Sequence, residues 1–275
     1  NSSASQESNT VKLPILKVNL YPTAIENYLN YERIFIKNEA GKKIDIKALL
    51  NEKLSLGLKS SDKGPQVLIV HTHATERFND TGETYTKGVN MNTTNNKKNV
   101  TAVGAKLADI LEAGGIKVIQ SKEQHDSPKY TGAYTRSLET VESYLKKYPT
   151  IKVVIDLHRD ALIRDDGTGL RPVVDINNKN AAQIMLVVGT GTTQYKNAHW
   201  EENLKFALQL QQNLEAKYPT ITRPLLLIDS RYNMHVSNGA LVIEIGSVSN
   251  TLSEATYSAE LLGGILTQII NNEIK

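Results

Sequence analysis

Three short apolar runs, each followed directly by charged and imidazole side chains, constrain the fold of this chain more than any other feature. The runs QVLIV, IKVVI and ALVI lead into HTHATE, DLHRDA and EIGSVSNT. Each run is rich in Val and Ile and has the length of a strand that is buried on both faces. Ligands bind beyond the carboxyl ends of strands in open α/β sheets, so we expect the three polar clusters to meet at one edge of a sheet.

The rest of the sequence alternates strand-length and helix-length segments. A helix is predicted over residues 100–113, where apolar side chains recur at helical spacing and Gly114-Gly115 provide a C-cap signal. Further elements are helices over 136–147, 200–217 and 257–271, and strands over 67–70, 116–119, 151–155, 183–188, 225–228 and 241–245. Strands separated by helices indicate βαβ units. We therefore predict an α/β fold with a mostly parallel, twisted sheet and helices on both of its faces.

Composition along the chain predicts three parts. Residues 1–10 are polar and typical of a disordered linker, and residues 11–64 are predicted to form a small N-terminal appendage. The polar, Gly-Pro-containing stretch SSDKGP marks the boundary, and residues 65–275 form the main domain, which holds the three polar clusters. In the appendage we expect a hairpin made of 33–36 and 43–46, and a short helix over 48–58. Long loops, which are usually functional, are predicted over 77–96, 121–135 and 159–180.

Composition also narrows the chemistry. The 275 residues include no cysteine, which excludes disulfides, thiolate zinc sites and cysteine nucleophiles. A net charge of +3 and a pI of about 8.8 fall short of the basic patterning of a nucleic-acid-binding protein. No run approaches the ~20 apolar residues of a membrane span. Because the chain opens in a polar linker, we expect any membrane contact to come from an anchor upstream of it.

The polar clusters contain the ligand types of a catalytic zinc site. His73 and Glu76 form an H-x-x-E pattern just beyond a strand, where a turn brings side chains three apart to one side. His158 follows the second run and is the expected third ligand, which leaves one coordination position for water. His71 is either an alternate ligand or a group that orients a ligand.

Two charged residues are candidates for the reaction itself. Glu244 lies inside an otherwise apolar strand, where an unpaired carboxylate is costly, and we predict that it is the general base toward a zinc-activated water. Arg159 is predicted to bind a substrate carboxylate or the oxyanion of the intermediate. Either Asp156 or Asp160 is expected to hold the second ring nitrogen of His158.

The predicted loops hold weaker candidates. His125, Asp126 and His235 are expected to line the cleft, and Arg136 to reach a peptide carboxylate. The stretch GTGTT at 189–193 lacks the lysine of a phosphate-binding loop, and neither H-E-x-x-H nor G-x-S-x-G occurs. These absences disfavour a nucleotide-binding protein, a zincin protease and a serine hydrolase.

Five blocks, which occur in order, resemble the stage II sporulation protein P family. They are HTHATE, NVTAVGAKLADIL, YTGAYTRSLETV, YPTIKVVIDLHRDA and RYNMHVSNGALVIEIGSVSNT, and the resemblance runs from about Gln66 to the C-terminus. This family is similar to zinc-dependent N-acetylmuramoyl-L-alanine amidases, which implies an amidase or zinc-exopeptidase-like fold. The block EIGSVSN resembles the one that carries the amidase glutamate, which implies that role for Glu244. DLHRDA and HTH resemble the blocks of two ligand histidines, best matched by His158 and His73.

One position departs from the wider amidase pattern. Those enzymes take a ligand glutamate from the start of the first helix, where this chain reads NNKKNV, with Lys97 and Lys98 and no carboxylate. Glu76 is the best substitute, and its spacing from His73 resembles that of zinc carboxypeptidases.

The resemblance also implies a biological setting. It implies a Zn²⁺ enzyme that hydrolyses septal peptidoglycan during engulfment, at the N-acetylmuramoyl-L-alanine amide and at stem-peptide cross-links. Stage II sporulation proteins D and M are the implied partners, and the implied location is the mother-cell membrane, facing the space between the two membranes. Two alternatives stay open. One is a non-catalytic peptidoglycan-binding or scaffolding module without stoichiometric metal. The other is a zinc carboxypeptidase, which needs an arginine for a terminal carboxylate.

Overall fold

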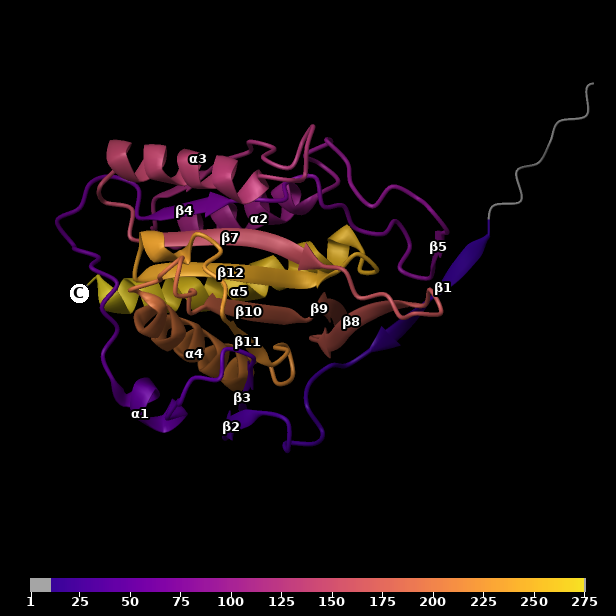
Figure 1. The fold of residues 1–275 in the computed structure, drawn as a ribbon, viewed down its shortest axis with the longest axis horizontal. Coiled ribbons are helices and arrows are strands. Elements are labelled where there is room, and N and C mark those ends of the chain that lie inside the picture. The colour runs from indigo at the N-terminus through magenta and orange to yellow at the C-terminus, as the bar shows by residue number, and fades with distance from the viewer. Residues whose placement is uncertain (1–10, 275) are drawn as a thin grey trace, which may run out of the picture.

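An eight-stranded sheet forms the centre of the fold (Figure 1). The computed structural model describes residues 11–274. In spatial order the strands are β2 (Leu29–Tyr31), β3 (Ile34–Asn38), β11 (Leu225–Ile228), β10 (Ile184–Gly189), β12 (Gly239–Ser247), β7 (Val153–Asp160), β4 (Val67–Val70) and β6 (Val118–Gln120). Strands β12, β7, β4 and β6 are parallel to one another, whereas β10, β11 and β3 share the opposite direction. The prediction of a mostly parallel sheet is confirmed.

Helices cover both faces of this sheet, as predicted. Three of them, α2 (Val100–Ala113), α4 (Trp200–Lys217) and α5 (Leu252–Glu273), pack on one face, which we call the α5 face. Helix α3 (Ala133–Lys147) packs on the other, the α3 face. Side chains alternate along each strand, so Ile69 and Ile155 join the core of the α5 face while Leu68 and Val154 join that of the α3 face.

Local capping explains where the helices begin and end. Asn99 caps α2, accepting a hydrogen bond from the Thr101 backbone, and α2 ends at Gly114 as its Gly-Gly signal predicts. Helix α5 begins with a capping box, in which Thr251 and Glu254 each bind the other's backbone amide. Among the described residues, no helix combines the length and apolar character needed to cross a bilayer.

Residues 11–64 are woven into the fold instead of forming an appendage beside it. Strand β3 pairs with β11 and so extends the central sheet. Strand β1 (Lys12–Val18) belongs to a second, four-stranded sheet of order β5-β1-β8-β9. The predicted linker at residues 1–10 lies outside the described residues.

The hairpin predicted in this segment is wrong in one of its two strands. Strand β3 pairs with the preceding β2, not with residues 43–46, which form no strand. The reason is local: Asp45 accepts a hydrogen bond from the backbone of Ala48, an N-cap that starts helix α1 (Ile46–Asn51). The short helix expected over 48–58 is therefore shifted toward the N-terminus.

Two of the predicted loops contain strands of the second sheet. Strand β5 (Thr84–Thr86) lies within 77–96, and β8 (Gly169–Ile176) starts within 159–180, with β9 (Lys179–Ala182) after it. The turn between β8 and β9 is Asn177-Asn178, with φ values of 54° and 61°. Two consecutive asparagines with positive φ are typical of a tight β-hairpin, a signal that was present in the sequence. Figure 1 shows this sheet past the arrowhead of β7.

Candidate metal centre

The three polar clusters meet at one edge of the central sheet, as their positions predict. Strand β12 pairs with β7 so that Glu244 lies beside His158. Strand β4 pairs with the other side of β7 and places Val70 beside Asp156, so the chain after β4 also emerges at this edge. The carboxyl ends of three parallel strands therefore supply the residues of all three polar clusters.

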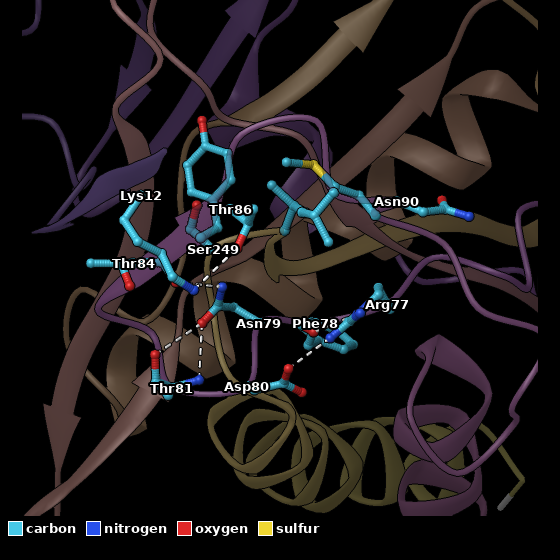
Figure 2. A pocket seen from close by; sticks show the side chains of 14 residues that line it. Lys12, Arg77, Phe78, Asn79, Asp80, Thr81, Thr84, Thr86, Asn90 and Ser249 are labelled. Carbon is cyan, nitrogen blue, oxygen red and sulfur yellow. Dashed lines mark hydrogen bonds and ion pairs between the residues drawn. The ribbon is translucent and has the colours of Figure 1, made fainter. Parts of the chain in front are cut away.

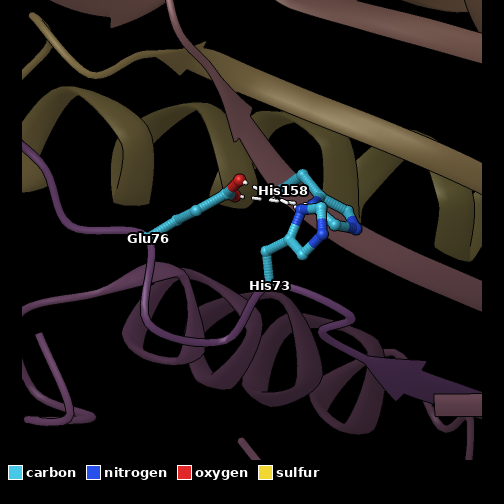
Figure 3. A group of neighbouring side chains, drawn as sticks. All are labelled: His73, Glu76 and His158. Carbon is cyan, nitrogen blue, oxygen red and sulfur yellow. Dashed lines mark ion pairs between the residues drawn. The ribbon is translucent and has the colours of Figure 1, made fainter. Parts of the chain in front are cut away.

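His73, Glu76 and His158 form a compact group in which one ligand atom of each residue lies within 4.8 Å of the others (Figure 3). The Nδ1 of His73 is 3.5 Å from Glu76 Oε1, and the Nδ1 of His158 is 3.4 Å from Glu76 Oε2. A turn closed by the Glu76 amide, which donates to the His73 carbonyl, brings the two residues together. Two imidazoles and a carboxylate fit a zinc ion with an open position, as the H-x-x-E spacing predicts.

An ion pair and two hydrogen bonds behind it hold the orientation of His158. Its second ring nitrogen, Nε2, lies 2.9 Å from Asp156 Oδ1 in an ion pair without hydrogen-bond geometry. Asp156 in turn accepts hydrogen bonds from the backbone and hydroxyl of Thr72, at 2.8 and 2.6 Å. A carboxylate behind a ligand histidine is the usual arrangement at zinc sites. Of the two aspartates considered for this position, Asp156 occupies it, and Asp160 forms an ion pair with Arg223 instead.

The charges around the group favour a cation. Burial alone would raise the pKa of Glu76, but His158, with hydrogen bonds from His158 and His73, holds that pKa well below its ordinary value. Burial would lower the pKa of His158, yet the carboxylates of Asp156 and Glu76 raise it well above the ordinary value. The surroundings of both residues therefore stabilise positive charge at the place where a metal would bind.

Glu244 has the environment expected of a general base that also carries a proton. Its Oε2 is buried and has no hydrogen-bond partner among the described residues. Burial raises the pKa of this carboxyl to about 8, and the charges of Glu76 and Asp160 act in the same direction, against His158 and Arg223. An unpartnered carboxylate oxygen beside a candidate metal ligand marks a place for water or substrate.

His71 does not belong to the group, which corrects its inclusion among the candidate ligands. It continues the alternation of Ile69 and so faces the α5 side of the sheet. Both ring nitrogens have partners there: Nδ1 lies 3.0 Å from the Leu157 carbonyl and Nε2 lies 3.0 Å from the Gln120 amide. Burial lowers its pKa to about 4. A Cβ on Gly104 of α2 would lie 2.6 Å from the ring, so the helix packs directly against it.

Arg159 also has a position different from the one expected. Its guanidinium donates to the carbonyls of Arg77 and Met91, at 3.0 and 2.8 Å, and the side chain is buried. Only its backbone amide contacts the group, by donating to Glu76 Oε2 at 3.0 Å. The side chain therefore holds the segment after Glu76 in place, and the expected role in binding substrate has no support in this geometry.

The loop candidates are part of the scaffold. His125 binds the His71 carbonyl and the Thr140 hydroxyl, and Asp126 accepts from Thr75. Arg136 donates to three loop carbonyls, those of His125, Lys129 and Thr131. His235 lies in a 3-10 turn (Met234–Val236) near Arg231 and His199, outside the metal group. None of these side chains is placed with the metal group.

Sequence reasoning missed three residues at the site. The ring of Tyr130 stacks on His73 at 4.4 Å between centroids and is 66% exposed. Tyr134 approaches His73 edge-on at 5.5 Å, and burial and the carboxylates of Asp156 and Glu244 raise its pKa. Arg223 is the third. The tyrosines stood in a loop already predicted to be functional, whereas Arg223 had no sequence signal beyond its place before a strand.

A pocket of about 190 Å³ begins at Arg77, the residue after Glu76 (Figure 2). Its lining consists largely of hydroxyl and amide side chains. They come from β1, from β5 and from the chain after Glu76 on both sides of β5. Lys12 reaches it from β1 and donates to the Thr86 hydroxyl at 3.1 Å. The N-terminal strand therefore helps to build a pocket beside the candidate centre.

Solved structures with a similar fold are cell-wall amidases at low sequence identity. The CwlD amidase from Clostridioides difficile, in complex with the GerS lipoprotein, is 12% identical with a TM-score of 0.44, and the match covers 75% of this chain and 97% of that one. An N-acetylmuramyl-L-alanine amidase from Mycobacterium smegmatis is 10% identical with a TM-score of 0.43, covering 77% and 100%. Likenesses at this level carry no argument about this chain.

Sequence relatives are more informative. Stage II sporulation protein P from Bacillus subtilis (strain 168) is 30% identical over 216 residues, which are 74% of this chain and 50% of that protein. The chain thus spans about half the length of this curated relative. The family model described as stage II sporulation protein P matches residues 5–267. With nearly its whole length matched, the chain belongs to the stage II sporulation protein P family.

Proposed function

We propose that this chain is a zinc-dependent peptidoglycan hydrolase that cleaves the amide between N-acetylmuramic acid and L-alanine. The observation that carries the proposal is the group of His73, Glu76 and His158, with the unpartnered carboxylate of Glu244 on the adjacent strand. Membership of the family and the fit of the donor set to zinc support it.

His73, Glu76 and His158 would hold the metal, and Asp156 would keep His158 in the tautomer that presents Nδ1. When bound, zinc supplies a Lewis acid that polarises the amide carbonyl and makes water more acidic. Glu244 takes the proton from the attacking water and passes it to the leaving amine. Its raised pKa suits the second of these steps, because a carboxyl that retains a proton near neutral pH is an effective acid.

The wider setting is proposed from the family alone. We extend the proposal to stem-peptide cross-links as a second scissile bond and to engulfment during sporulation as the process. Stage II sporulation proteins D and M are the proposed partners. An anchor in the mother-cell membrane would hold the chain in the space between the two membranes.

The carboxypeptidase alternative is weakened by one observation. Its sequence argument relied on Arg159 or Arg136 to bind a terminal carboxylate, and both side chains are bound to backbone carbonyls. The binding-module alternative predicts that the purified protein holds no stoichiometric metal, so it is separated by a metal assay.

The test combines metal content with product analysis. Wild-type protein, His158→Ala and Glu244→Gln are purified, assayed for zinc and incubated with purified peptidoglycan. We expect near-stoichiometric zinc in wild type and Glu244→Gln, and none in His158→Ala. Only wild type should release peptides with a free L-alanine amino terminus, detected by mass spectrometry. Wild type that holds zinc but releases single C-terminal amino acids would favour the carboxypeptidase, and wild type without zinc or turnover would favour the binding module.

A further inference from the structure

Arg223 reaches the candidate active site from the segment just before β11, a strand that contributes no other residue to it. Its backbone amide donates to the Ile184 carbonyl of β10, at 2.8 Å, just before β11 begins. Its side chain forms an ion pair with Asp160 of β7, at 2.8 Å. Strand β12 lies between β10 and β7. The arginine side chain therefore crosses the carboxyl end of β12, where Glu244 is located.

The guanidinium of Arg223 is buried but poorly satisfied. Arg223 is 9% exposed, and its Nη1 has no partner in hydrogen-bond geometry, since the contact with Asp160 is an ion pair without suitable angles. Within residues 11–274 this guanidinium donates no hydrogen bond to a protein acceptor. Most buried polar groups in proteins are paired, so an unpaired one needs an explanation. Two further atoms at this edge have no hydrogen-bond partner, His158 Nε2 on β7 and Glu244 Oε2 on the strand that Arg223 crosses, and only the second lies without an ion pair.

Arg159 shows what a satisfied arginine looks like in the same region. It is buried to a similar extent, at 7% exposure, yet its guanidinium donates to two carbonyls. Arg223 instead donates no hydrogen bond to a protein acceptor, while the carboxylate of Asp160 balances its charge. That combination is suited to an anionic or strongly polarised oxygen, which a guanidinium binds through two parallel N–H groups.

We propose that Arg223, held by Asp160, is a catalytic residue that binds an anionic oxygen of the substrate beside Glu244. This inference rests on the proposed function, since it takes the substrate from it. Two substrate groups share the required chemistry. One is the oxyanion that develops on the scissile carbonyl, and the other is a carboxylate of the stem peptide.

The experiment uses four variants and one kind of substrate in two forms. Arg223→Gln removes the guanidinium but leaves the carboxylate of Asp160 without its ion-pair partner. The double variant Asp160→Asn/Arg223→Gln removes both charges and so leaves no unpaired one. Arg223→Lys keeps the charge and loses the fork, and it serves if the double variant does not fold. Arg171→Gln is the matched control, because Arg171 forms a partly buried ion pair with Glu254 away from the metal group. Substrates are muropeptides with stem carboxylates either free or amidated.

Kinetics and binding are both measured. Each variant is assayed for kcat and KM, for zinc content and for thermal unfolding. Binding of the intact muropeptide is measured by calorimetry on zinc-loaded protein in which Glu244→Gln prevents turnover. We expect zinc content to be retained in all four variants. Arg171→Gln should lower stability and leave kcat and KM of the folded protein unchanged.

The two sources of the anionic oxygen give different results. If Arg223 binds the oxyanion, the double variant loses about 10²-fold in kcat while muropeptide affinity is unchanged, because the interaction exists only after attack. If it binds a stem carboxylate, affinity falls by about 10-fold or more, and amidation of the substrate removes the difference. Arg223→Lys should show a smaller loss of the same kind.

Folded, zinc-loaded Arg223 variants with kcat, KM and affinity within twofold of wild type would overturn the proposal. Failure of the proposed function is a separate result, since it appears as wild-type protein that hydrolyses neither substrate.

Discussion

The two faces of the central sheet contain the same residue types at the same edge but use them differently. On the α3 face, the ring nitrogens of His158 lie against the carboxylates of Glu76 and Asp156. Nη1 of Arg223 lies against the carboxylate of Asp160, and none of these nitrogens has a backbone partner. On the α5 side, His71 binds a backbone carbonyl and a glutamine, and Arg159 binds two backbone carbonyls. Burial is similar in the two sets. What separates a candidate functional residue from a scaffold residue here is its unfilled hydrogen-bonding capacity.

The largest expected difference between the faces is in metal binding. His158→Ala should abolish zinc binding and hydrolysis, because it removes one of three ligands. His71→Ala should retain zinc while lowering the free energy of unfolding by about 1–3 kcal/mol, since it removes the contacts of the ring with the Leu157 carbonyl and the Gln120 amide and leaves that amide only the Thr101 carbonyl. Metal analysis and thermal unfolding of both variants check this. Loss of zinc from a folded His71→Ala protein would place His71 among the ligands after all.

Strand alternation explains which sequence candidates the structure brings together and why two of them, His71 and Arg159, lie elsewhere. The strand-end rule correctly brought His73, Glu76, His158 and Glu244 to one edge. The face on which His71 lies could also have been predicted. His71 is two residues after Ile69, so it faces the same side of the sheet, which is apolar and covered by helices. The position of Arg223 was not readable, since it depends on β10 and β12 being antiparallel neighbours.

The secondary structure likewise includes elements that the sequence predicts and elements that it does not. Helix α2, which is followed by Gly114, was predicted to its last residue, whereas α5 starts at Leu252 and not at the predicted residue 257, because its capping box at Thr251 was not used. The second sheet was missed because β1, β5 and β8 are joined across long sequence separations, and their half-exposed residues carry no continuous apolar run. Non-local pairing of this kind leaves little trace in a local pattern.

The next comparison is between two glutamates, Glu244, whose Oε2 is buried, and the buried Glu254. Glu244 has a pKa of about 8 in the folded protein against an ordinary 4.5. Between these values the unfolded chain ionises first, so the free energy of unfolding falls as pH rises from about 4.5 to 8. Glu244→Gln should therefore abolish turnover and stabilise the zinc-free protein at pH 7, by on the order of 2 kcal/mol.

Glu254 should behave in the opposite way. It caps α5 and binds Arg171 through both carboxylate oxygens, so Glu254→Gln should destabilise the fold by about 1–3 kcal/mol. Thermal unfolding of both zinc-free variants across pH 4 to 9 separates them. A stability of Glu244→Gln that follows wild type at every pH would mean that the carboxyl carries no burial penalty.

Asp156 sharpens the comparison because it acts on the metal only through His158. Asp156→Asn should weaken zinc binding by about 10–100-fold. Zinc must displace a proton from His158, whose pKa is raised by Asp156 and Glu76, so affinity should fall by up to about tenfold for each unit that pH is lowered. Removing the Asp156 charge lowers the pKa of His158, and the dependence on pH should then begin at lower pH. Competition with a chromophoric chelator across pH measures both effects, and a pH profile identical in the two proteins would contradict them.

The smallest effect is expected from the arginine that looked most functional in sequence. Arg159→Ala removes two hydrogen bonds to the carbonyls of Arg77 and Met91, which contribute about 1 kcal/mol each. Its backbone amide still donates to Glu76, so the metal group keeps that contact. We expect zinc content to be unchanged, kcat to fall by no more than about threefold, and limited proteolysis to cut between residues 77 and 91 faster than in wild type. A loss of about 10²-fold in kcat without faster cleavage would return the substrate-binding role to Arg159 and leave the unfilled capacity of Arg223 without a function.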